Sequence, residues 1–521
     1  MHGLNIEREV RTIELEELAN LKSEILEVRE QEQPPRTMWE LYSRIWELGD
    51  QWRKENSYIV NEGKKNERVE IPRPSVAIVA KALQEICHFT FIGEGVISDI
   101  SKLYLYHLDL GHYVSSNDIF RKLLLKYDSR LTSNKFFLEL ISYIRTETKM
   151  KPPLDDYRYI PVANGVYNIK THKLEEFSPN FVITSKIQTE YNPCARKPIL
   201  DGWFDFDRWL EALAVNDKEV VALLWQVINE AINPNRTRKK MVLMVGDGNN
   251  GKGTFQSLLE NLIGRSNISN LKPDQFGKEF YLGALEGKVC NIGDDISNKY
   301  LDEVSDLMSV ISGDPVQVNK KSLQPVEARF RLLCIFSGND LPRARNKTMG
   351  WYRRLCIIPF RADFNGQKER HEIKDRFIKN KELLEWVLFK VLNMPDFDSF
   401  IEPEAVQKML SKYKNDNDYI KVWVENFYIP NGWHEINHVP MFIARNKLKE
   451  FAEDIGIDKP KLGQFSNAVM AELEKTTSYK YSAKNGTVSS KFYDVLDPQG
   501  FQRKRFVKGI WGIHLEDEDL G

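Results

Sequence analysis

The stretch KKMVLMVGDGNNGKGTFQSLLENLIG, residues 239–264, predicts a strand, a glycine-rich loop and a helix in succession. Residues 241–245 form an apolar run with the length and composition of a buried strand. The loop follows at residues 246–254, and the apolar side chains after it recur at helical spacing as far as Gly264. This succession is the local structure that a site for nucleotide phosphates requires.

Seven residues of the loop are candidates for binding the nucleotide. Glycine lets the backbone bend so that successive N–H groups point at phosphate oxygens. The helix N-terminus adds partial positive charge, and we expect Lys252 to reach the outer phosphates. The candidates are Gly246, Gly248, Asn250, Gly251, Lys252, Gly253 and Thr254. A chance glycine-rich turn is the alternative, and the flanking strand and helix count against it.

Gly253 departs from the usual pattern of such loops. In that pattern Ser or Thr directly follows the lysine, and its hydroxyl binds magnesium. Here the hydroxyl comes one residue later, on Thr254, which is therefore the candidate magnesium ligand of the loop. If Thr254 does not bind the ion, carboxylates and water must hold it alone.

Composition and charge exclude several classes of protein. A chain of 521 residues is expected to hold three or four domains. Because 74 Lys and Arg balance 75 Asp and Glu, any nucleic-acid surface must be a local patch. The five cysteines include no C-x-x-C pair, which argues against a zinc site. No run is apolar enough to span a membrane, and the first residues lack the apolar core of a signal peptide, so we expect a soluble, intracellular protein.

The chain is predicted to open with two regions that precede the glycine loop. Residues 1–70 are expected to be helical, with helices over residues 4–32 and 39–52 and a flexible polar segment after them. Residues 71–235 mix helical and strand patterns and form an α+β domain. The dipeptide Asn164-Gly165 within it is a hairpin signal.

Apolar strands recur after the loop and define the central domain. They are expected at residues 288–292, 331–336 and 355–360, and they alternate with helical segments. This alternation predicts an α/β domain over residues 236–365, with a mostly parallel sheet and its phosphate site at the strand ends. Residues 366–400 read as a helical lid, and residues 401–521 as a separate domain.

Polar residues at two strand ends are candidate catalytic groups. Asp294 and Asp295 follow one apolar strand, where one carboxylate can hold magnesium, with Asp294 as the candidate ligand, and the other can polarise the attacking water. Asn339 ends the next strand, where its amide can contact the γ-phosphate or that water. An acidic surface turn and an ordinary strand-end Asn are the alternatives.

The same region contains two pairs of basic residues that are candidate functional groups. Arg353 and Arg354 are candidates for an arginine finger that stabilises transition-state charge, or they form a surface pair. Residues 313–329 predict a hairpin with Lys320 and Lys321 at its tip. Two lysines on a projecting tip suit contacts with DNA phosphates, and a solvated loop is the alternative.

The order GDGNNGKGTF, NIGDDI, ISGDPVQVNKK, FSGNDLP and YRR-x5-F resembles the superfamily 3 helicases, a group of AAA+-like P-loop ATPases. Within them it is most similar to the poxvirus and satellite-phage primase–helicase type, as found in replication initiators of phages and phage-related pathogenicity islands. The motor resemblance covers about residues 236–365. A second resemblance, carried by NGVYNIKTHKLEEFSP and TEYNPCA, extends over roughly residues 100–235.

The resemblance implies a homo-hexameric ring that uses ATP and Mg²⁺ to move on DNA and unwind it, in the cytoplasm of a bacterial host cell. It assigns the phosphate lysine to Lys252, the acidic pair to Asp294 and Asp295, and the sensor to Asn339. Lys320 and Lys321 match the DNA-contacting tip. Arg354, before Arg353, matches the finger that a neighbouring subunit supplies.

Relatives with a primase domain carry it at the N-terminus, where roughly 100 residues are too few and no Asp-x-Asp motif with a following His is found. We therefore expect a helicase that depends on a separate primase or other replication partner. An origin-binding protein whose ATPase controls only assembly, a packaging translocase and a bifunctional primase–helicase are the alternatives.

The last region has the pattern of a winged helix. Helices are expected at residues 442–455 and 462–473, followed by strands within residues 475–496 and 501–515. In such a fold the second helix can enter the major groove, which makes Gln464 a candidate for reading base edges. Arg503 and Arg505 are candidates for phosphate contacts. A winged helix used for protein contacts is the alternative.

Overall fold

The computed structural model describes residues 34–93, 101–297, 300–319, 325–366, 370–454, 465–499 and 503–516. The chain divides into two compact units. The first comprises residues 1–155 and 176–184, and the second comprises residues 156–175 and 185–521. Across the described ranges, no helix has both the length and the apolar character needed to cross a bilayer.

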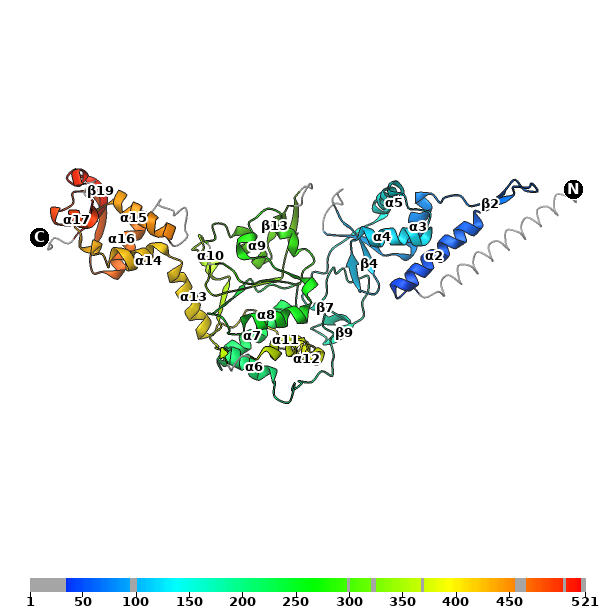
Figure 1. Ribbon diagram of the computed structural model, residues 1–521, viewed down its shortest axis with the longest axis horizontal. Helices are drawn as coiled ribbons and strands as arrows, with labels where there is room; N and C mark the ends of the chain where they lie inside the picture. Colours follow the sequence, from blue (N-terminus) through cyan, green and yellow to red (C-terminus); the bar gives the residue numbers. More distant parts are fainter. Residues whose placement is uncertain are drawn as a thin grey trace, which may run out of the picture. The chain divides into compact units, whose positions relative to one another are not determined.

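The first unit packs four helices and a sheet around one apolar core (Figure 1). Side chains that accept backbone N–H groups begin three of the helices, from Thr37, Ser75 and Ser116. The helices are α2 (Met38–Glu55), α3 (Val76–Ile86), α4 (Asn117–Tyr127) and α5 (Asn134–Glu147). The sheet has the order β5-β4-β3-β6, with β3 (Phe89–Ile92), β4 (Leu103–His107), β5 (His112–Val114) and β6 (Met150–Lys151).

Helix α2 belongs to the same core as the elements after it. Met38, Leu41 and Ile45 are buried and pack with α3, α4 and α5, so the predicted boundary at residue 70 does not separate two packed bodies. The polar segment after α2, expected to be flexible, forms an antiparallel hairpin of β1 (Tyr58–Val60) and β2 (Arg68–Glu70). The helix expected over residues 4–32 lies outside the described residues.

A five-stranded parallel sheet forms the centre of the second unit. Its order is β11-β12-β15-β10-β16, so the strand before the glycine loop lies between two strands that are distant in sequence. The strands are β10 (Met241–Val245), β11 (Ile268–Ser269), β12 (Cys290–Gly293), β15 (Leu333–Gly338) and β16 (Leu355–Pro359). Strands β10 and β16 are continuously apolar because helices cover both faces of a parallel sheet, whereas β11 and β12 contain the buried polar residues Ser269 and Asn291.

Alternate residues of the strands enter two separate cores. Val242 and Met244 pack in the core that contains α8, and Met241 and Leu243 pack in the core that contains α9. In Figure 1, α8 is drawn below the sheet and α9 above it. The lower helices are α6 (Phe206–Leu213), α7 (Lys218–Ala231), α8 (Lys252–Ile263), α11 (His371–Asp375) and α12 (Lys381–Leu392). The upper face carries α9 (Ser305–Ser312) and α10 (Met349–Tyr352), while α13 (Glu404–Asp416) lies against the edge strand β16 and contributes to both cores.

This packing moves the predicted boundaries at residues 235 and 400. Helices α6 and α7 precede the predicted motor, yet their apolar faces share one core with β10 and α8. A three-stranded sheet of β7 (Tyr159–Val162), β8 (Gly165–Asn168) and β9 (Lys173–Glu175) also adds to it. At the other end, Val406 and Tyr413 of α13 belong to the cores of the parallel sheet.

Two hairpins fall where the sequence predicts them. Strands β7 and β8 pair so that Val162 faces Gly165, which leaves Ala163 and Asn164 as the turn. Strands β13 (Pro315–Val318) and β14 (Val326–Arg329) form the second antiparallel pair. Its tip, with Lys320 and Lys321, lies outside the described residues.

The last region has its own aromatic core and a three-stranded antiparallel sheet of order β17-β19-β18. Its elements are α14 (Tyr419–Trp423), β17 (His438–Pro440), α15 (Met441–Asp454), α16 (Phe465–Thr476), β18 (Tyr481–Gly486) and β19 (Ile510–Leu515). Val424–Tyr428 continue α14 as a wide helical turn.

The strands predicted in this region are too long. Only residues 481–486 and 510–515 pair, and residues 490–496 and 503–506 are helical instead (α17, Tyr493–Leu496, and α18, Arg503–Phe506). The reason is burial: Val488, Leu496 and Phe506 turn into the aromatic core at irregular spacing, which an alternating strand cannot provide.

Candidate nucleotide site

Two glycines of the loop are required by close approach of the backbone. A Cβ at Gly246 would lie 2.1 Å from the Asn250 amide nitrogen and 2.2 Å from the Phe360 carbonyl oxygen. Gly251 has φ of +87°, and a Cβ there would lie 2.2 Å from a methyl group of Leu213. Larger residues therefore cannot take either position without displacing the loop.

Lys252 is the first residue of α8 and points back into the loop. Its ammonium donates to the Gly246 carbonyl at 2.5 Å and to Asn250 Oδ1 at 3.0 Å. Asn250 in turn donates to the Phe360 carbonyl at 3.1 Å, which ties the loop to the end of β16. Burial lowers the pKa of Lys252, and the nearby Asp247 and Asp294 oppose that change. The ammonium is thus held by neutral oxygens that phosphate oxygens can replace.

The ends of β12 and β15 bring further polar groups to the same place. Asp294 follows β12, and the Ser337 hydroxyl of β15 donates to Asp294 Oδ1. Asn339 follows Gly338, the last residue of β15. Because the strands are parallel, their carboxyl ends meet at one edge, as the sequence predicted.

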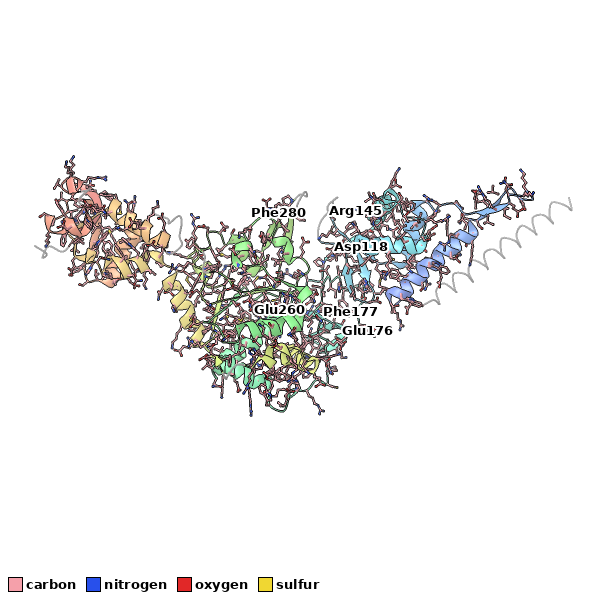
Figure 2. All side chains as sticks on the ribbon, viewed as in Figure 1. Asp118, Arg145, Glu176, Phe177, Glu260 and Phe280 are labelled. Atoms are coloured by element: carbon pink, nitrogen blue, oxygen red, sulfur yellow. The ribbon has the colours of Figure 1, made fainter. Side chains whose placement is uncertain are left out.

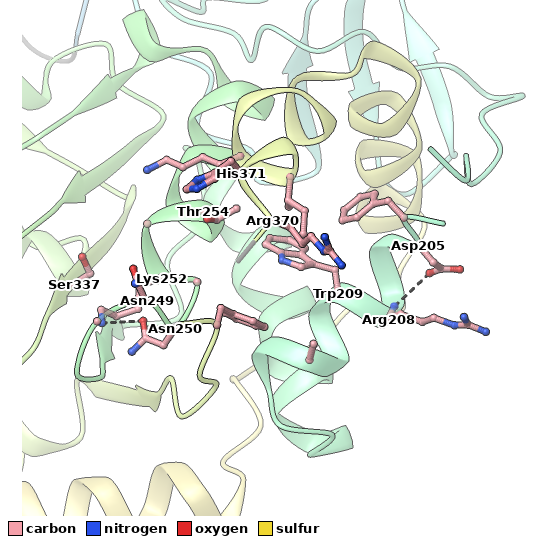
Figure 3. Close-up of a pocket in the computed structure, with 18 of the residues that line it drawn as sticks. Asp205, Arg208, Trp209, Asn249, Asn250, Lys252, Thr254, Ser337, Arg370 and His371 are labelled. Carbon is pink, nitrogen blue, oxygen red and sulfur yellow. Dashed lines mark hydrogen bonds between the residues drawn. The ribbon is translucent and has the colours of Figure 1, made fainter. Parts of the chain in front are cut away.

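A cavity of about 590 Å³ joins these groups (Figure 3). Lys252, Thr254, Asp294 and Asn339 line it, together with the loop residues from Gly248 onward. Asp295 and Gly246 are not among the lining residues. Asp295 has φ of +49°, and its backbone carbonyl accepts from the Lys272 ammonium at 2.8 Å, so of the pair only Asp294 belongs to the lining.

The opposite wall contains residues that sequence reasoning did not find. In Figure 3, Trp209 and Arg370 lie across the cavity from Asn249, Asn250 and Lys252. This wall is aromatic and basic: Trp203, Phe204, Arg208, Trp209, Phe364, Arg370, His371 and Lys374. These residues come from α6, α11 and their connections, and no local motif marks them because only the tertiary fold brings them to the loop.

Phe364 and Lys374 of this wall both lie beside the loop, and the backbone N–H of Phe364 donates to the Asn249 carbonyl at 3.0 Å. A Cβ at Gly253 would lie 3.8 Å from the Lys374 ammonium, and no other atom would lie within 4 Å of it. The ammonium of Lys374 therefore lies beside the space that a Ser or Thr side chain would enter. At the position where Gly253 departs from the usual pattern, the cation Lys374 of α11 therefore lies next to the loop.

The two candidate arginines have different surroundings. The guanidinium of Arg354 donates to the Ser312 hydroxyl at 2.6 and 2.9 Å and to the Gly350 carbonyl at 2.5 Å. Burial and the neighbouring Arg353 lower the pKa of Arg354, and Asp314 opposes them. The side chain of Arg353 is exposed, and within the described ranges it makes no hydrogen bond or ion pair.

Magnesium could be held by oxygens already in the cavity, namely the Thr254 hydroxyl and the Asp294 carboxylate. Such a small set suits this ion, which keeps several waters and takes oxygens from the nucleotide. Among the described residues, no group of three or more His, Cys, Asp or Glu could hold a metal by itself.

The candidate DNA-binding residues are only partly visible. Lys320, Lys321 and Gln464 lie outside the described residues, as does the side chain of Arg503. Arg505 is exposed on α18, with its guanidinium 4.3 Å from the centre of the Phe442 ring. Its charge faces solvent while its position is fixed against α15.

Two parts of the chain match protein families. Residues 44–213 match the family described as D5 N terminal like, and residues 244–354 match a family of unknown function, DUF5906. A curated relative from Invertebrate iridescent virus 3, named "Putative helicase 121R", is 24% identical over 268 residues. That match covers 44% of this chain and 28% of the relative, so the chain spans little more than a quarter of that protein.

Two solved structures of the apo NrS-1 C terminal region are also similar. One is 12% identical with a TM-score of 0.43, covering 80% of this chain and 97% of that one. The other is 11% identical with a TM-score of 0.43, covering 85% and 100%. At this TM-score the two structures carry no argument, and it is the family match over residues 44–213 and the viral relative that support the resemblance to a primase–helicase indicated by the motifs.

Proposed function

We propose that this chain is a replication helicase of a phage or mobile genetic element that binds ATP with Mg²⁺ and uses its hydrolysis to move on DNA as a hexameric ring. One observation carries the proposal: Lys252, Thr254, Asp294 and Asn339 line a single cavity at the carboxyl edge of a parallel sheet. A phosphate lysine, a hydroxyl, a carboxylate and an amide are the groups that phosphoryl transfer to water needs.

Each group has a role that its position supports. Lys252 exchanges the Gly246 carbonyl and Asn250 for phosphate oxygens, and Asn250 keeps its backbone aligned with β16. Thr254 and Asp294 would hold magnesium, which would neutralise charge on the outer phosphates. Ser337 fixes the Asp294 carboxylate, and Asn339 is placed to hold the attacking water. Asp295, outside the lining, completes the acidic pair only if its side chain turns toward the cavity.

The basic wall supplies a second phosphate contact in this proposal. The Lys374 ammonium lies beside the space that a side chain at position 253 would enter. A cation there binds the terminal phosphate from the side opposite to Lys252, which strengthens the preference for a triphosphate over a diphosphate. The aromatic side chains Trp209 and Phe364 leave an apolar surface for the nucleotide base.

The arginine finger is assigned to Arg353 and not to Arg354. Arg354 uses its guanidinium within its own subunit, on Ser312 and Gly350. Arg353 is exposed and free to enter the site of a neighbour. In a ring each contact is head-to-tail, so one subunit's loop meets another subunit's finger.

The last region is proposed as a winged-helix-like DNA-binding domain. The order α14, β17, α15, α16, β18, β19 with sheet order β17-β19-β18 is the arrangement of such a fold, with short helical turns in place of a simple wing. Gln464 would read base edges at the start of α16, and Arg503 and Arg505 would bind phosphates.

The test measures ATP hydrolysis with and without single-stranded DNA, strand separation on a forked duplex, and particle mass in the same samples. We expect DNA-stimulated hydrolysis and unwinding by ring-sized particles, both absent in Lys252→Ala. Hydrolysis without unwinding would favour an origin-binding protein whose ATPase controls assembly. Primer synthesis on a single-stranded template would favour a bifunctional primase–helicase, for which the match to the D5 N terminal like family gives the specific reason.

A further inference from the structure

A groove in the first unit has features that the motor does not explain. Helices α2 and α4 pack side by side, and a cavity of about 380 Å³ lies between exposed side chains on them. Trp46 of α2 lines one side, and Asp118, Arg121, Lys122, Leu125 and Lys126 of α4 line the other. Figure 2 labels Asp118 on this helix. We call this the α2–α4 groove.

The groove exposes large apolar side chains. Trp46 is 53% exposed and Leu125 is 42% exposed, although both stand on helices whose other faces are well buried. Trp39, two helical turns before Trp46 on the same face, is 75% exposed. Burial of the two tryptophan side chains would lower the free energy of the protein, and here that gain is not realised. An exposed apolar face of this kind marks a binding surface.

The cations of the groove are not neutralised by acids. The ammonium of Lys122 lies 4.6 Å from the centre of the Tyr42 ring, and Arg121 stacks on Phe137 at 4.0 Å while donating to Asn134. Elsewhere in this unit basic side chains pair with carboxylates, as Lys54 does with Asp50. Within the described ranges neither Lys122 nor Lys126 has such a partner. Three cations against Asp118 leave the groove positively charged.

We propose that the α2–α4 groove binds single-stranded DNA, with a base stacked on Trp46 and the backbone phosphates on Lys122 and Lys126. Exposed aromatic rings beside unpaired cations are the combination that binds an unpaired strand without regard to sequence. A duplex does not fit this arrangement because its bases are stacked inside and cannot reach the Trp46 ring. The proposal adds a DNA site outside the motor, and it would hold the strand when no nucleotide is bound.

The experiment measures binding of a thymidine oligonucleotide of about 20 nucleotides to the full chain without nucleotide, over a range of salt. The test variant combines Lys122→Glu with Lys126→Glu. The matched control combines Lys64→Glu with Lys65→Glu, which reverses the same charge in the exposed turn between β1 and β2. Two lost phosphate contacts are expected to lower the salt slope of binding by about 1.4, while the control leaves it unchanged.

Trp46 is tested separately for stacking. Trp46→Ala is expected to weaken binding between about fivefold and a hundredfold, and Trp46→Phe to restore most of it. Strands that contain 5-bromouracil should photo-crosslink to Trp46, as located by mass spectrometry. Thermal melting checks that the exposed substitution leaves the fold intact.

Three results would overturn the inference. The first is equal loss of affinity in the test and control charge variants. The second is a crosslink that never reaches Trp46. The third is displacement of the oligonucleotide by polyglutamate at equal charge, which would make the groove a site for an acidic protein segment. All variants keep Lys252 and its loop, so basal ATP hydrolysis should be unchanged. A chain without any ATPase activity would refute the motor, not the groove.

Discussion

The proposed function divides Arg353 from Arg354: Arg354 is expected to stabilise the fold, and Arg353 is expected to act on the nucleotide of a neighbouring subunit. Arg354→Ala removes the hydrogen bonds to the Ser312 hydroxyl and the Gly350 carbonyl, both within its own subunit. At about 1 kcal/mol for each partner, with some desolvation penalty for groups left unpaired, the free energy of unfolding should fall by about 2–3 kcal/mol. For a domain of this size the melting midpoint should fall by about 4–10 °C.

Arg353→Ala should behave in the opposite way. An exposed side chain without a partner contributes little to stability, so its removal should change the free energy of unfolding by less than about 0.5 kcal/mol. If Arg353 is the finger, ATP hydrolysis should fall by about a thousandfold or more. Ser312→Ala serves as the matched control, because it removes the same contact from Arg354 and leaves Arg353 untouched.

The assay combines thermal melting, ATPase turnover and mixing of subunits. In equal mixtures of Arg353→Ala and Lys252→Ala subunits, about a quarter of the interfaces join an intact loop to an intact finger, so that share of activity should return. The reasoning fails if Arg354→Ala loses hydrolysis at wild-type stability, or if Arg353→Ala keeps full turnover. It also fails if mixed rings form and remain inactive.

The remaining predictions concern the cavity and the DNA-binding surfaces. Lys252→Ala should abolish ATP hydrolysis at unchanged melting temperature, and wild-type turnover in this variant would refute the proposal that the chain is an ATP-driven motor. Thr254→Ala should reduce ATP hydrolysis severely if the Thr254 hydroxyl binds magnesium. Lys374→Ala should weaken binding of ATP about tenfold and binding of ADP far less. Lys379→Ala is the control on the same segment. Equal losses of affinity for both nucleotides would contradict a contact between Lys374 and the terminal phosphate. Lys320→Ala with Lys321→Ala should keep basal hydrolysis and lose DNA stimulation and unwinding, and normal unwinding would make the tip a solvated loop. Gln464→Ala should reduce the preference for the cognate origin over random DNA, while Arg503→Ala with Arg505→Ala should weaken binding to all duplexes alike. If the wild-type protein shows no preference for the origin in a competition assay at physiological salt, sequence-specific recognition of the origin is excluded.

Local sequence was sufficient for the phosphate loop and the central strands. The positive φ of Gly251 and the approach of Asn250 to Gly246 are properties of the loop itself, although Leu213 and Phe360, both distant in sequence, also exclude a side chain at these two positions. The runs at β10, β15 and β16 are largely apolar because both faces of the sheet are covered. Such patterns also placed Asp294 and Asn339 at one edge, since parallel strands end together.

Tertiary structure decided everything that depends on which distant segments meet. The boundaries at residues 70, 235 and 400 could not be predicted from composition because α2, α7 and α13 share cores with segments far along the chain. The strands after residue 475 were overestimated because burial of Val488 and Phe506 in an aromatic core overrides strand patterning.

In the candidate site, too, one part follows from local sequence and another part depends on tertiary packing. The sequence by itself determined the wall that carries Lys252, because one continuous segment builds it. The opposite wall, with Trp209 and Lys374, exists only because α6 and α11 pack beside the loop. The different surroundings of the two adjacent arginines were likewise beyond the sequence, since they depend on Ser312 of another helix reaching Arg354. Hydrogen bonds and apolar contacts act over a few ångströms in space, and only the folded chain specifies which residues lie within that range.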